Sequence, residues 1–505
     1  MAGYLRECGV VSSCPAPVIV TVTTSAPVSL ADVVAIADGA RVVVADDVHE
    51  ALVRSAAAAE EIAARTPTYG RSTGVGANRE TAVTDALDHG LRLIRSHATD
   101  AGEPLPPRVV RALIATRLAQ LSRAGSGIEP GIVPALARTL DRAELPEIGS
   151  VGSIGTGDLA ALAALALILA GERGPADLGA GAQAAVRWGV ESALPFLSSS
   201  ALTIGRAVLA SDELKRLDRA SRIVFSLAAT ALRANPSAVS ATAAAAASAP
   251  RVADVSAQVR ALRGPSDEPA RIQDPYGLRV YPLTQAALLT AVARLDDQLK
   301  RLVNAAQENP VFDADASTVT HHGSFFQAQL ALDLDSLTLA LAQAATNAHA
   351  LLRLTNEPAY TGLRPFLATG PDGSSGLMML EYTAAAALAE VRNAADPASL
   401  GTIALSRATE EDASFATQAA VQLERAVASY RVILACEALA VSRLLSQLDP
   451  PVSTALTAAA RAIRDLQPSQ EDQDLRDPLG RASALLDELA SLVEPGEDPD
   501  RDLAP

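Results

Sequence analysis

The sequence predicts an all-α fold, in which a bundle of long helices follows a small, loop-rich N-terminal part. From Thr81 onward, apolar residues recur at spacings of three and four between Gly and Pro punctuation, which is typical of amphipathic helices. Several of these periodic segments exceed about 25 residues, a length that favours a bundle of packed helices. The chain of 505 residues is 49% apolar, enough for a large core.

The elements follow from local patterns. Residues 1–60 alternate Val-rich extended pieces with a short helix at Leu30–Ala37, and a Pro-Thr-Tyr-Gly loop comes next. Long helices are predicted at Arg108–Arg123, Leu159–Glu172, Leu202–Ala234, Thr284–Ala306, Phe326–Leu354, Leu377–Ala394 and Glu411–Leu448, and a further one near Leu479–Leu492. The run Ala243–Ala247 fits either close helix packing or mere composition bias. We divide the chain into an N-terminal domain (1–200) with a Tyr loop and a Gly-rich loop, a central bundle (201–465), and a C-terminal helix with an acidic tail (466–505).

Composition excludes several classes of function. A net charge of −16 without a Lys/Arg cluster argues against a nucleic-acid partner and favours a small molecule. Three cysteines, Cys8, Cys14 and Cys436, form neither a disulfide framework nor a zinc spacing, so we expect a cytoplasmic protein. The longest apolar run, Leu159–Ala170, is too short to cross a bilayer, so no membrane partner is expected. The six histidines are scattered apart from His321-His322, and we expect no metal site.

Six polar segments interrupt the helical pattern. They are Tyr69–Gly76, Ser96-His97 with Gly102–Pro104, the Gly-rich stretch 149–159, Gln273–Arg279, Asn304 with Asn309-Pro310, and Glu410–Asp412. Each has a structural explanation when taken singly. Tyr69 fits a half-buried loop aromatic, Arg279 fits a surface ion pair, and the acidic triplet fits the first turn of a helix, where the dipole favours negative charge.

Taken in order, these segments resemble the aromatic amino acid lyases, the superfamily of histidine and phenylalanine ammonia-lyases, from about residue 25 to the C-terminal helix. The matching motifs are YGxxTG at 69–74 with Gly76, SHA at 96–98 with GEPLP at 102–106, GSxG at 149–152 with GDL at 157–159, QDPYxLR at 273–279, Asn304, Asn309-Pro310, and Glu-Asp at 411–412. The resemblance implies the all-helical ammonia-lyase/fumarase-like fold. It also implies a homotetramer whose active sites draw residues from three chains.

One departure concerns the family's prosthetic group. In that family an Ala-Ser-Gly tripeptide cyclises to a methylideneimidazolone, the electrophile that assists the loss of ammonia. Here Gly155-Thr156-Gly157 stands before Asp158, in the catalytic position where the family has Ala-Ser-Gly. Aligned from the left instead, the segment offers Ser153-Ile154-Gly155, and the branched Cβ of Ile154 crowds the nitrogen that would cyclise. We therefore expect no methylideneimidazolone and no other cofactor.

The resemblance assigns roles to other residues. Tyr69 matches the catalytic base, Tyr276 the second catalytic tyrosine, and Arg279 the residue that holds the substrate carboxylate. A phenol with an ordinary pKa near 10 must be adjusted or positioned by its neighbours to act at neutral pH. The resemblance also assigns a substrate-binding role to His97, Ser198, Gln273, Asn309, Phe325 and Glu411.

Some of these substrate-binding positions keep the family pattern and others depart from it. His97 and Glu411 follow the histidine-type branch, which implies a polar or cationic substrate side chain. Ser198 begins Ser-Ser-Ser-Ala where the family has Asn-Gly-Thr-Gln, which removes a contact to the prosthetic ring. Phe325 keeps the phenylalanine of an Asn-Phe-His stretch that here reads Ser-Phe-Phe.

Three functions are compatible with this pattern. The first is an enzyme that eliminates, adds or isomerises an amino acid or similar carboxylate with the Tyr base alone, which suits a substrate with a more acidic proton or a better leaving group. The second is a conventional ammonia-lyase or aminomutase with an irregular ring at Thr156 or Ser153. The third is an inactive homologue that serves as a binding subunit.

Overall fold

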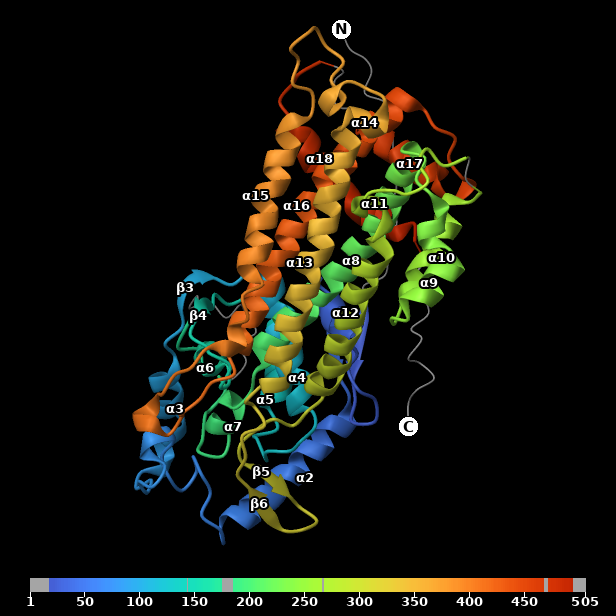
Figure 1. Ribbon diagram of the computed structural model, residues 1–505. Coiled ribbons are helices and arrows are strands. Elements are labelled where there is room, and N and C mark those ends of the chain that lie inside the picture. Colours follow the sequence, from blue (N-terminus) through green and yellow to red (C-terminus); the bar gives the residue numbers. More distant parts are fainter. Residues whose placement is uncertain (1–17, 143, 175–184, 266–267, 467–470, 494–505) are drawn as a thin grey trace, which may run out of the picture.

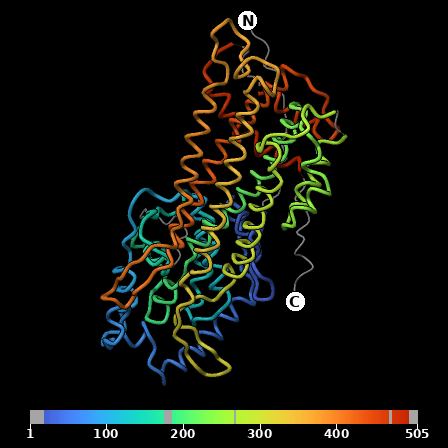
Figure 2. The backbone as a smooth tube through the Cα atoms, viewed as in Figure 1, coloured from blue at the N-terminus to red at the C-terminus, as the bar shows by residue number. Residues whose placement is uncertain are grey.

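Long helices dominate the structure, a computed structural model that describes residues 18–142, 144–174, 185–265, 268–466 and 471–493. Five of them run side by side along the molecule (Figures 1 and 2). They are α8 (Ala201–Ala231), α12 (Tyr281–Val303), α13 (Ala328–Asn356), α15 (Met378–Ala394) and α16 (Ala416–Leu448). The predicted all-α bundle is confirmed, and the helices of the central part lie within a few residues of the predicted ranges.

The centre of the bundle is formed by α8 and α16, which pack against each other and are buried on most sides. Their apolar residues continue around the helix because α4, α12, α13, α15 and α18 cover them. Within the described residues one stretch, Ala193–Ala231, is long and apolar enough to span a membrane, and its apolar window lies entirely inside the protein. One apolar cluster runs from Val20 to Ala490, so the N-terminal part and the bundle share a core.

The N-terminal part begins with a two-stranded parallel sheet, β1 (Ile19–Val22) and β2 (Arg41–Val44), connected by α1 (Leu30–Ala37). Ser29 caps α1 through a reciprocal pair of hydrogen bonds with Asp32. The expectation of Val-rich extended pieces and one short helix is right for residues 18–44, whereas residues 1–17 lie outside the described residues. It is wrong beyond residue 44, because Asp46–Ala63 forms the 18-residue helix α2. Its Ala- and Glu-rich sequence favours helix, and Val48, Leu52, Ala59 and Ile62 form its buried stripe.

The remaining elements are short. Those of the lower part of Figure 1 are η1 (Gly76–Asn78), α3 (Ala86–His97), β3 (Ala101–Pro104), α4 (Pro107–Leu121), α5 (Ile132–Leu140), β4 (Gly149–Val151), α6 (Leu159–Leu169), α7 (Ala193–Leu197), β5 (Val311–Asp313), β6 (Thr318–Thr320) and η5 (Ser406–Ala408). The others are η2 (Pro236–Val239), α9 (Ala241–Ala247), α10 (Val252–Arg263), α11 (Tyr276–Arg279), α14 (Pro358–Thr361), η3 (Pro365–Leu367), η4 (Ala398–Leu400), η6 (Thr454–Leu456), α17 (Thr457–Arg464) and α18 (Arg476–Ser491). Strands β3 and β4 pair antiparallel, as do β5 and β6.

One helix boundary differs from expectation, one alternative stays open, and some predicted features lie outside the described residues. Helix α16 begins at Ala416, not at Glu411, because Phe415 has a left-handed backbone (φ +54°) that starts the helix there. In the run Ala243–Ala247 Ala244 is buried, Ala247 packs against the core, and the helix lies against α10, so both explanations of this run stay open. Cys436 is buried and unpaired, whereas Cys8, Cys14 and the acidic tail after residue 493 lie outside the described residues.

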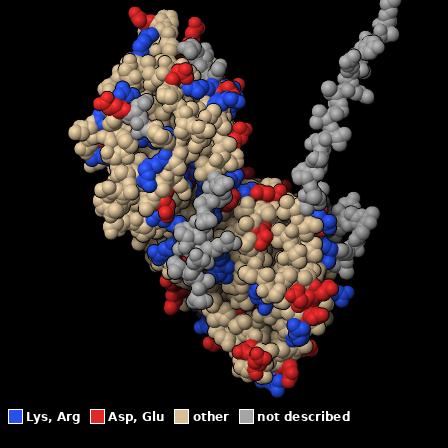
Figure 3. Space-filling model, turned by 90° about the vertical axis from the view of Figure 1, so that its right-hand side faces the viewer, with Lys and Arg blue, Asp and Glu red and all other residues tan. Residues whose placement is uncertain are grey.

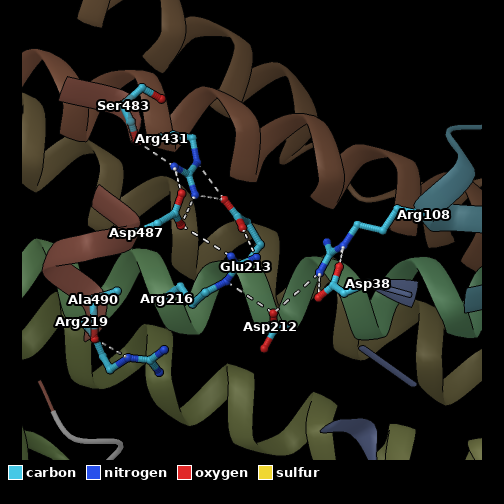
Figure 4. A network of polar contacts seen from close by, with 10 residues as sticks. All are labelled: Asp38, Arg108, Asp212, Glu213, Arg216, Arg219, Arg431, Ser483, Asp487 and Ala490. Atoms are coloured by element: carbon cyan, nitrogen blue, oxygen red, sulfur yellow. Dashed lines mark hydrogen bonds and ion pairs between the residues drawn. The ribbon is translucent and has the colours of Figure 1, made fainter. Parts of the chain in front are cut away.

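The last helix, α18, is attached to the bundle by a network of ion pairs (Figure 4). Arg431 of α16 donates to Asp487 of α18 at 2.9 and 3.1 Å and to Glu213 of α8 at 2.8 Å. At the other end of the network Arg108 of α4 pairs with Asp38 at 2.7 Å. On the face drawn in Figure 3, basic and acidic side chains are interspersed rather than separated into patches.

Candidate functional site

A cavity of about 510 Å³ lies where the Tyr69 loop, α3, the Gly-rich loop and the loop before α16 meet. Six of the predicted site residues line it: Tyr69, His97, Thr156, Ser198, Asn309 and Phe325. They come from segments that are far apart in the sequence, so the fold itself brings them together. The other lining residues include His89, Arg92, Ser406 and Glu410, which the sequence analysis did not assign to the site.

The Tyr69 loop is held by hydrogen bonds on both sides of the tyrosine. The backbone N–H of Gly76 donates to the Tyr69 hydroxyl oxygen at 2.7 Å, and the Tyr69 N–H donates to Nε2 of His321 at 3.1 Å. Gly70 has φ +76°, and a Cβ there would lie 2.2 Å from Cδ2 of Leu194, so only glycine fits. The phenol is therefore fixed in place by its own loop and by His321.

Within a single chain the environment does not activate the phenol as a base. Burial raises the pKa of Tyr69, and the charge of Glu410 raises it further. The Gly76 N–H and the charge of Arg79 act in the opposite direction, but the net direction is upward. Within the described residues the Gly76 N–H and Arg79 do not outweigh burial, so a net lowering of this pKa requires a further group, such as one from a substrate or from another subunit.

The Gly-rich loop is fastened to the start of α16. The Ser414 hydroxyl donates to the Gly155 carbonyl at 2.7 Å, the Phe415 N–H donates to the Ile154 carbonyl at 2.9 Å, and the Gln418 amide donates to the Ser153 carbonyl at 2.8 Å. At the start of the loop, Asp100 accepts from the Gly149 N–H at 2.7 Å and pairs with Arg173 at 2.5 Å. The loop is thus rigid at both ends, and Thr156 lies on the cavity wall between them.

Asp158, directly after this loop, is a buried anchor. Its carboxylate accepts from the Thr203 N–H at 2.8 Å and from the Thr203 hydroxyl at 3.0 Å, and its N–H donates to the Ser199 carbonyl at 2.7 Å. Burial, the largest influence, raises the pKa of Asp158 above its ordinary range, although these hydrogen bonds oppose the rise. The aspartate joins the Gly-rich loop to the first turn of α8 and does not line the cavity.

The floor of the cavity contains Ser198, Asn309 and Phe325. The Ser198 hydroxyl donates to the Leu194 carbonyl at 2.9 Å, and Oδ1 of Asn309 accepts from the His322 N–H at 3.0 Å. Below this floor Arg117 and Glu308 form a fully buried ion pair at 2.9 Å. Asn304, the other asparagine of that motif, lies outside the cavity, where Oδ1 accepts from the Val28 N–H and from Arg123, both at 2.8 Å.

Helix α3 supplies the wall that carries His97. Nδ1 of His97 lies 2.8 Å from the Leu93 carbonyl, so Nδ1 carries a proton and Nε2 is left for the cavity. Glu411 is exposed and does not line the cavity, whereas its neighbour Glu410 does. The backbone of Glu410 pairs with Leu405, and residues 406–408 all have positive φ, so the turn, not the spacing in the sequence, determines which carboxylate faces inward.

Three predicted residues, Gln273, Tyr276 and Arg279, lie together elsewhere. The Arg279 guanidinium lies 4.6 Å from the centre of the Tyr276 ring, and the Gln273 amide oxygen accepts from Arg279 when the amide is oriented toward it. Tyr276 is 67% exposed, and Nε of Arg279 is buried with no hydrogen-bond partner in the described part of the chain. Gln273, Tyr276 and Arg279 therefore form a group of contacting side chains at the surface of the chain.

The elements α3 and α7, which help to line the cavity, and α11, which carries the second group, lie near opposite ends of α13 (Figure 1). Phe325 precedes the first turn of α13, whereas Gly277 of α11 lies against Ala350 and Leu351 near its other end. At 1.5 Å per residue, the 22 residues between Ala328 and Ala350 span about 33 Å. Tyr69 and Arg279 of one chain therefore cannot contact the same small molecule.

Comparison with known proteins identifies the family. A model of the family "aromatic amino acid lyase" matches residues 28–465. The chain belongs to this family. It is 31% identical to a histidine ammonia-lyase of Symbiobacterium thermophilum over 94% of this chain and 97% of that protein. This lyase also resembles the solved structures of ergothionase from Treponema denticola (TM-score 0.86, 21% identity, 94% of this chain and 100% of that chain) and of histidine ammonia-lyase from Trypanosoma cruzi (TM-score 0.85, 23% identity, 94% and 96%).

The expected resemblance, fold and assignment to the carbon–nitrogen lyases are confirmed by these matches.

Whether this lyase can carry the family's prosthetic group depends on the fit at residue 155. Gly155 has φ +85°, and a Cβ there would lie 2.3 Å from Oγ of Ser414 and 2.8 Å from the Phe415 nitrogen. An alanine side chain at residue 155 does not fit this loop as it is folded here. Within the described residues, no group of three or more His, Cys, Asp or Glu side chains is arranged to hold a metal ion.

Proposed function

We propose that this protein is a lyase resembling histidine ammonia-lyase that acts on an amino acid or similar carboxylate with Tyr69 as the base and without a methylideneimidazolone. The observation that carries the proposal is the cavity in which Tyr69, His97, Thr156, Ser198, Asn309 and Phe325 meet. In the proposed reaction Tyr69 removes a proton from the carbon next to the one that bears the leaving group. The C–H electrons form the double bond as the leaving group departs with its own bonding pair.

The active form is proposed to be a homotetramer with shared sites. Arg279 and Tyr276 of one subunit would approach the Tyr69 cavity of another, with Arg279 holding the carboxylate through two parallel hydrogen bonds. Two features support this. Nε of Arg279 has no hydrogen-bond partner among the described residues, and Tyr276 is exposed beside it. Apolar side chains of α12, α13 and α15 also face outward: Leu283, Leu332, Leu339, Met379 and Tyr382. The positive charge of Arg279 would also favour ionisation of Tyr69.

Absence of the ring is proposed from the loop. Gly155 leaves no space for the family's alanine, dehydration of Thr156 would leave an extra methyl group on the reactive carbon, and Ile154 crowds the alternative at Ser153. The intact mass of the purified chain tests this directly, because ring formation removes two molecules of water. A mass lower by two waters would mean that the conventional ammonia-lyase or aminomutase with an irregular ring is the correct function.

Shared sites make a complementation experiment possible. Tyr69→Phe and Arg279→Met should each abolish turnover, because a general base contributes about 10²- to 10⁴-fold and the carboxylate clamp contributes to orientation. Mixed tetramers formed by coexpressing the two variants should recover up to about one quarter of wild-type activity, since that fraction of sites receives both intact residues.

Each outcome has a clear meaning. No recovery in verified mixed tetramers would show that the two residues do not act in a shared site. Full activity in both single variants, with the tetramer intact, would contradict the site assignment. We further propose that the protein is cytoplasmic, as its cysteine content suggests.

A further inference from the structure

One face of α3 carries polar side chains that the proposed reaction does not use. His89, Arg92 and Ser96-His97 recur at helical spacing, and all of them line the cavity. The same face contributes Leu93, whose carbonyl holds His97. The wall of the cavity formed by α3 is therefore a row of hydrogen-bonding groups.

Arg92 is the cationic member of this row. Its guanidinium donates to Oδ2 of Asp85 at 2.8 Å and to the Asp85 carbonyl at 3.1 Å. A guanidinium has five N–H donors and no acceptor, so donors remain for a ligand after both bonds are made. Asp85 holds the side chain in place, and Asp85 itself does not line the cavity.

His89 adds a neutral polar group beside Arg92. Burial lowers the pKa of His89, and the nearby charge of Arg92 lowers it further, so the imidazole is neutral at pH 7. Its Nε2 is buried and has no hydrogen-bond partner among the described residues. Buried polar atoms nearly always have a hydrogen-bond partner. If the imidazole of His89 rotates, this nitrogen can form a hydrogen bond with a ligand group or a water molecule in the cavity.

The acidic residue of the cavity, Glu410, lies in a turn that contacts the Tyr69 loop. Glu410 belongs to the turn next to Ser406, whose hydroxyl oxygen accepts from the Ala77 N–H of the Tyr69 loop at 2.9 Å, and its charge raises the pKa of Tyr69. Tyr69 and Glu410 therefore share one side of the cavity, and Arg92 lies on α3. The cavity is polarised, with its fixed cation on the α3 wall.

From this polarity we propose that the substrate is an amino acid with a second acidic group, a carboxylate or similar oxyanion, at the end of its side chain. Arg92 binds that group, His89 donates to it or to its ordered water, Nε2 of His97 accepts from that water, and the substrate ammonium lies toward Glu410. The inference rests on the proposed function for the position of the α-carboxylate, which Arg279 of a neighbouring subunit holds.

Calorimetric binding to the purified oligomer tests the substrate class without requiring turnover. The probes are L-phenylalanine, 4-carboxy-L-phenylalanine and 4-amino-L-phenylalanine, which differ only at the far end of the ring. We expect the carboxy compound to bind at least about tenfold more tightly than phenylalanine, as a charge-assisted contact with arginine allows. The amino compound should bind most weakly of the three.

The matched variants are Arg92→Leu and Arg95→Leu. Arg95 lies on the same helix but pairs with Glu172 at 2.6 Å, away from the cavity, so its loss should leave the preference unchanged. Arg92→Leu should reduce the preference to about twofold or less, and Asp85→Asn, which frees the guanidinium, should increase it. If Arg92→Leu fails to fold, Arg92→Lys keeps the charge and should lose most of the preference with the loss of the planar fork.

Equal binding of all three probes, tighter binding of the amino compound, or no binding of the carboxy compound would overturn the proposal. An equal effect of Arg95→Leu and Arg92→Leu would also overturn it. These results are separate from the failure of the proposed function. Retained turnover in Tyr69→Phe would refute the base while leaving the binding preference as measured.

Discussion

Replacement of Gly155 by alanine tests the contact between the Gly-rich loop and α16. Two costs arise. An L-residue in the left-handed region costs about 1–2 kcal/mol, since the Cβ approaches the backbone. The new Cβ would also lie 2.3 Å from Oγ of Ser414 and 2.7 Å from the Ala416 nitrogen, so loop and helix must separate. Overpacking of this kind costs about 1–3 kcal/mol, for a total of roughly 2–5 kcal/mol.

A control within the same loop separates the two costs. Gly157 also has a left-handed backbone, φ +103°, but the nearest atom to an added Cβ is the Ser199 carbonyl oxygen at 3.6 Å. Gly157→Ala should therefore cost only the backbone term, about 1–2 kcal/mol. The difference between the two variants measures the packing of residue 155 against α16.

The assay is thermal unfolding at one fixed protein concentration, because the midpoint of an oligomer depends on concentration. We expect the order wild type, Gly157→Ala, Gly155→Ala from highest to lowest midpoint. A midpoint for Gly155→Ala equal to or above that of Gly157→Ala would refute the contact with α16. It would also remove the structural argument against the family's alanine at this position.

Two further predictions concern ion pairs. Burial raises the pKa of Asp100, but the hydrogen bonds from Arg173 and the Gly149 N–H, together with the charge of Arg173, lower it by more, and the net pKa lies below its ordinary value. The ionised carboxylate therefore stabilises the folded protein at neutral pH. This stabilisation is lost as the pH falls through the lowered pKa. Asp100→Asn should therefore destabilise the protein at pH 7, and acid titration of the unfolding midpoint should show the difference from wild type shrinking below about pH 4. Arg431→Ala should cost about 1–3 kcal/mol and expose α18 to limited proteolysis, whereas Arg65→Ala, at an exposed ion pair, should do neither. Equal cleavage in the two arginine variants would contradict the attachment of α18 by Arg431.

The long helices could be predicted from the sequence because each buries one face in the bundle. The buried positions are apolar, so apolar residues recur at the spacing of the helix. The 18-residue α2 was missed because its stripe is short and the neighbouring Val-rich strands dominate the local pattern. Short antiparallel pairs such as β5–β6 carry too few residues for alternation to be visible. The start of α16 depends on one left-handed residue, Phe415, which no propensity indicates.

For the site, motif resemblance predicted the six residues that meet in the cavity, because loops of this kind keep their polar residues in a fixed order. It did not distinguish Glu410 from Glu411, since the strained turn at 406–408 decides which side chain points inward. It also missed His89 and Arg92, although their spacing from His97 on α3 offered a signal. The distance from Tyr69 to Arg279 could not be predicted, because it depends on the length and direction of α13.

The ion-pair network of Figure 4 has a consequence for biosynthesis. Glu213 pairs with Arg431, which is translated 218 residues later, and Arg216 pairs with Asp487, which is translated 271 residues later. Glu213 and Arg216 pair with each other within α8, but their side of the helix is uncovered while the ribosome is still adding α12 to α16. Closure of the bundle is therefore a late event, and nascent chains that stop before α18 should depend most on chaperones.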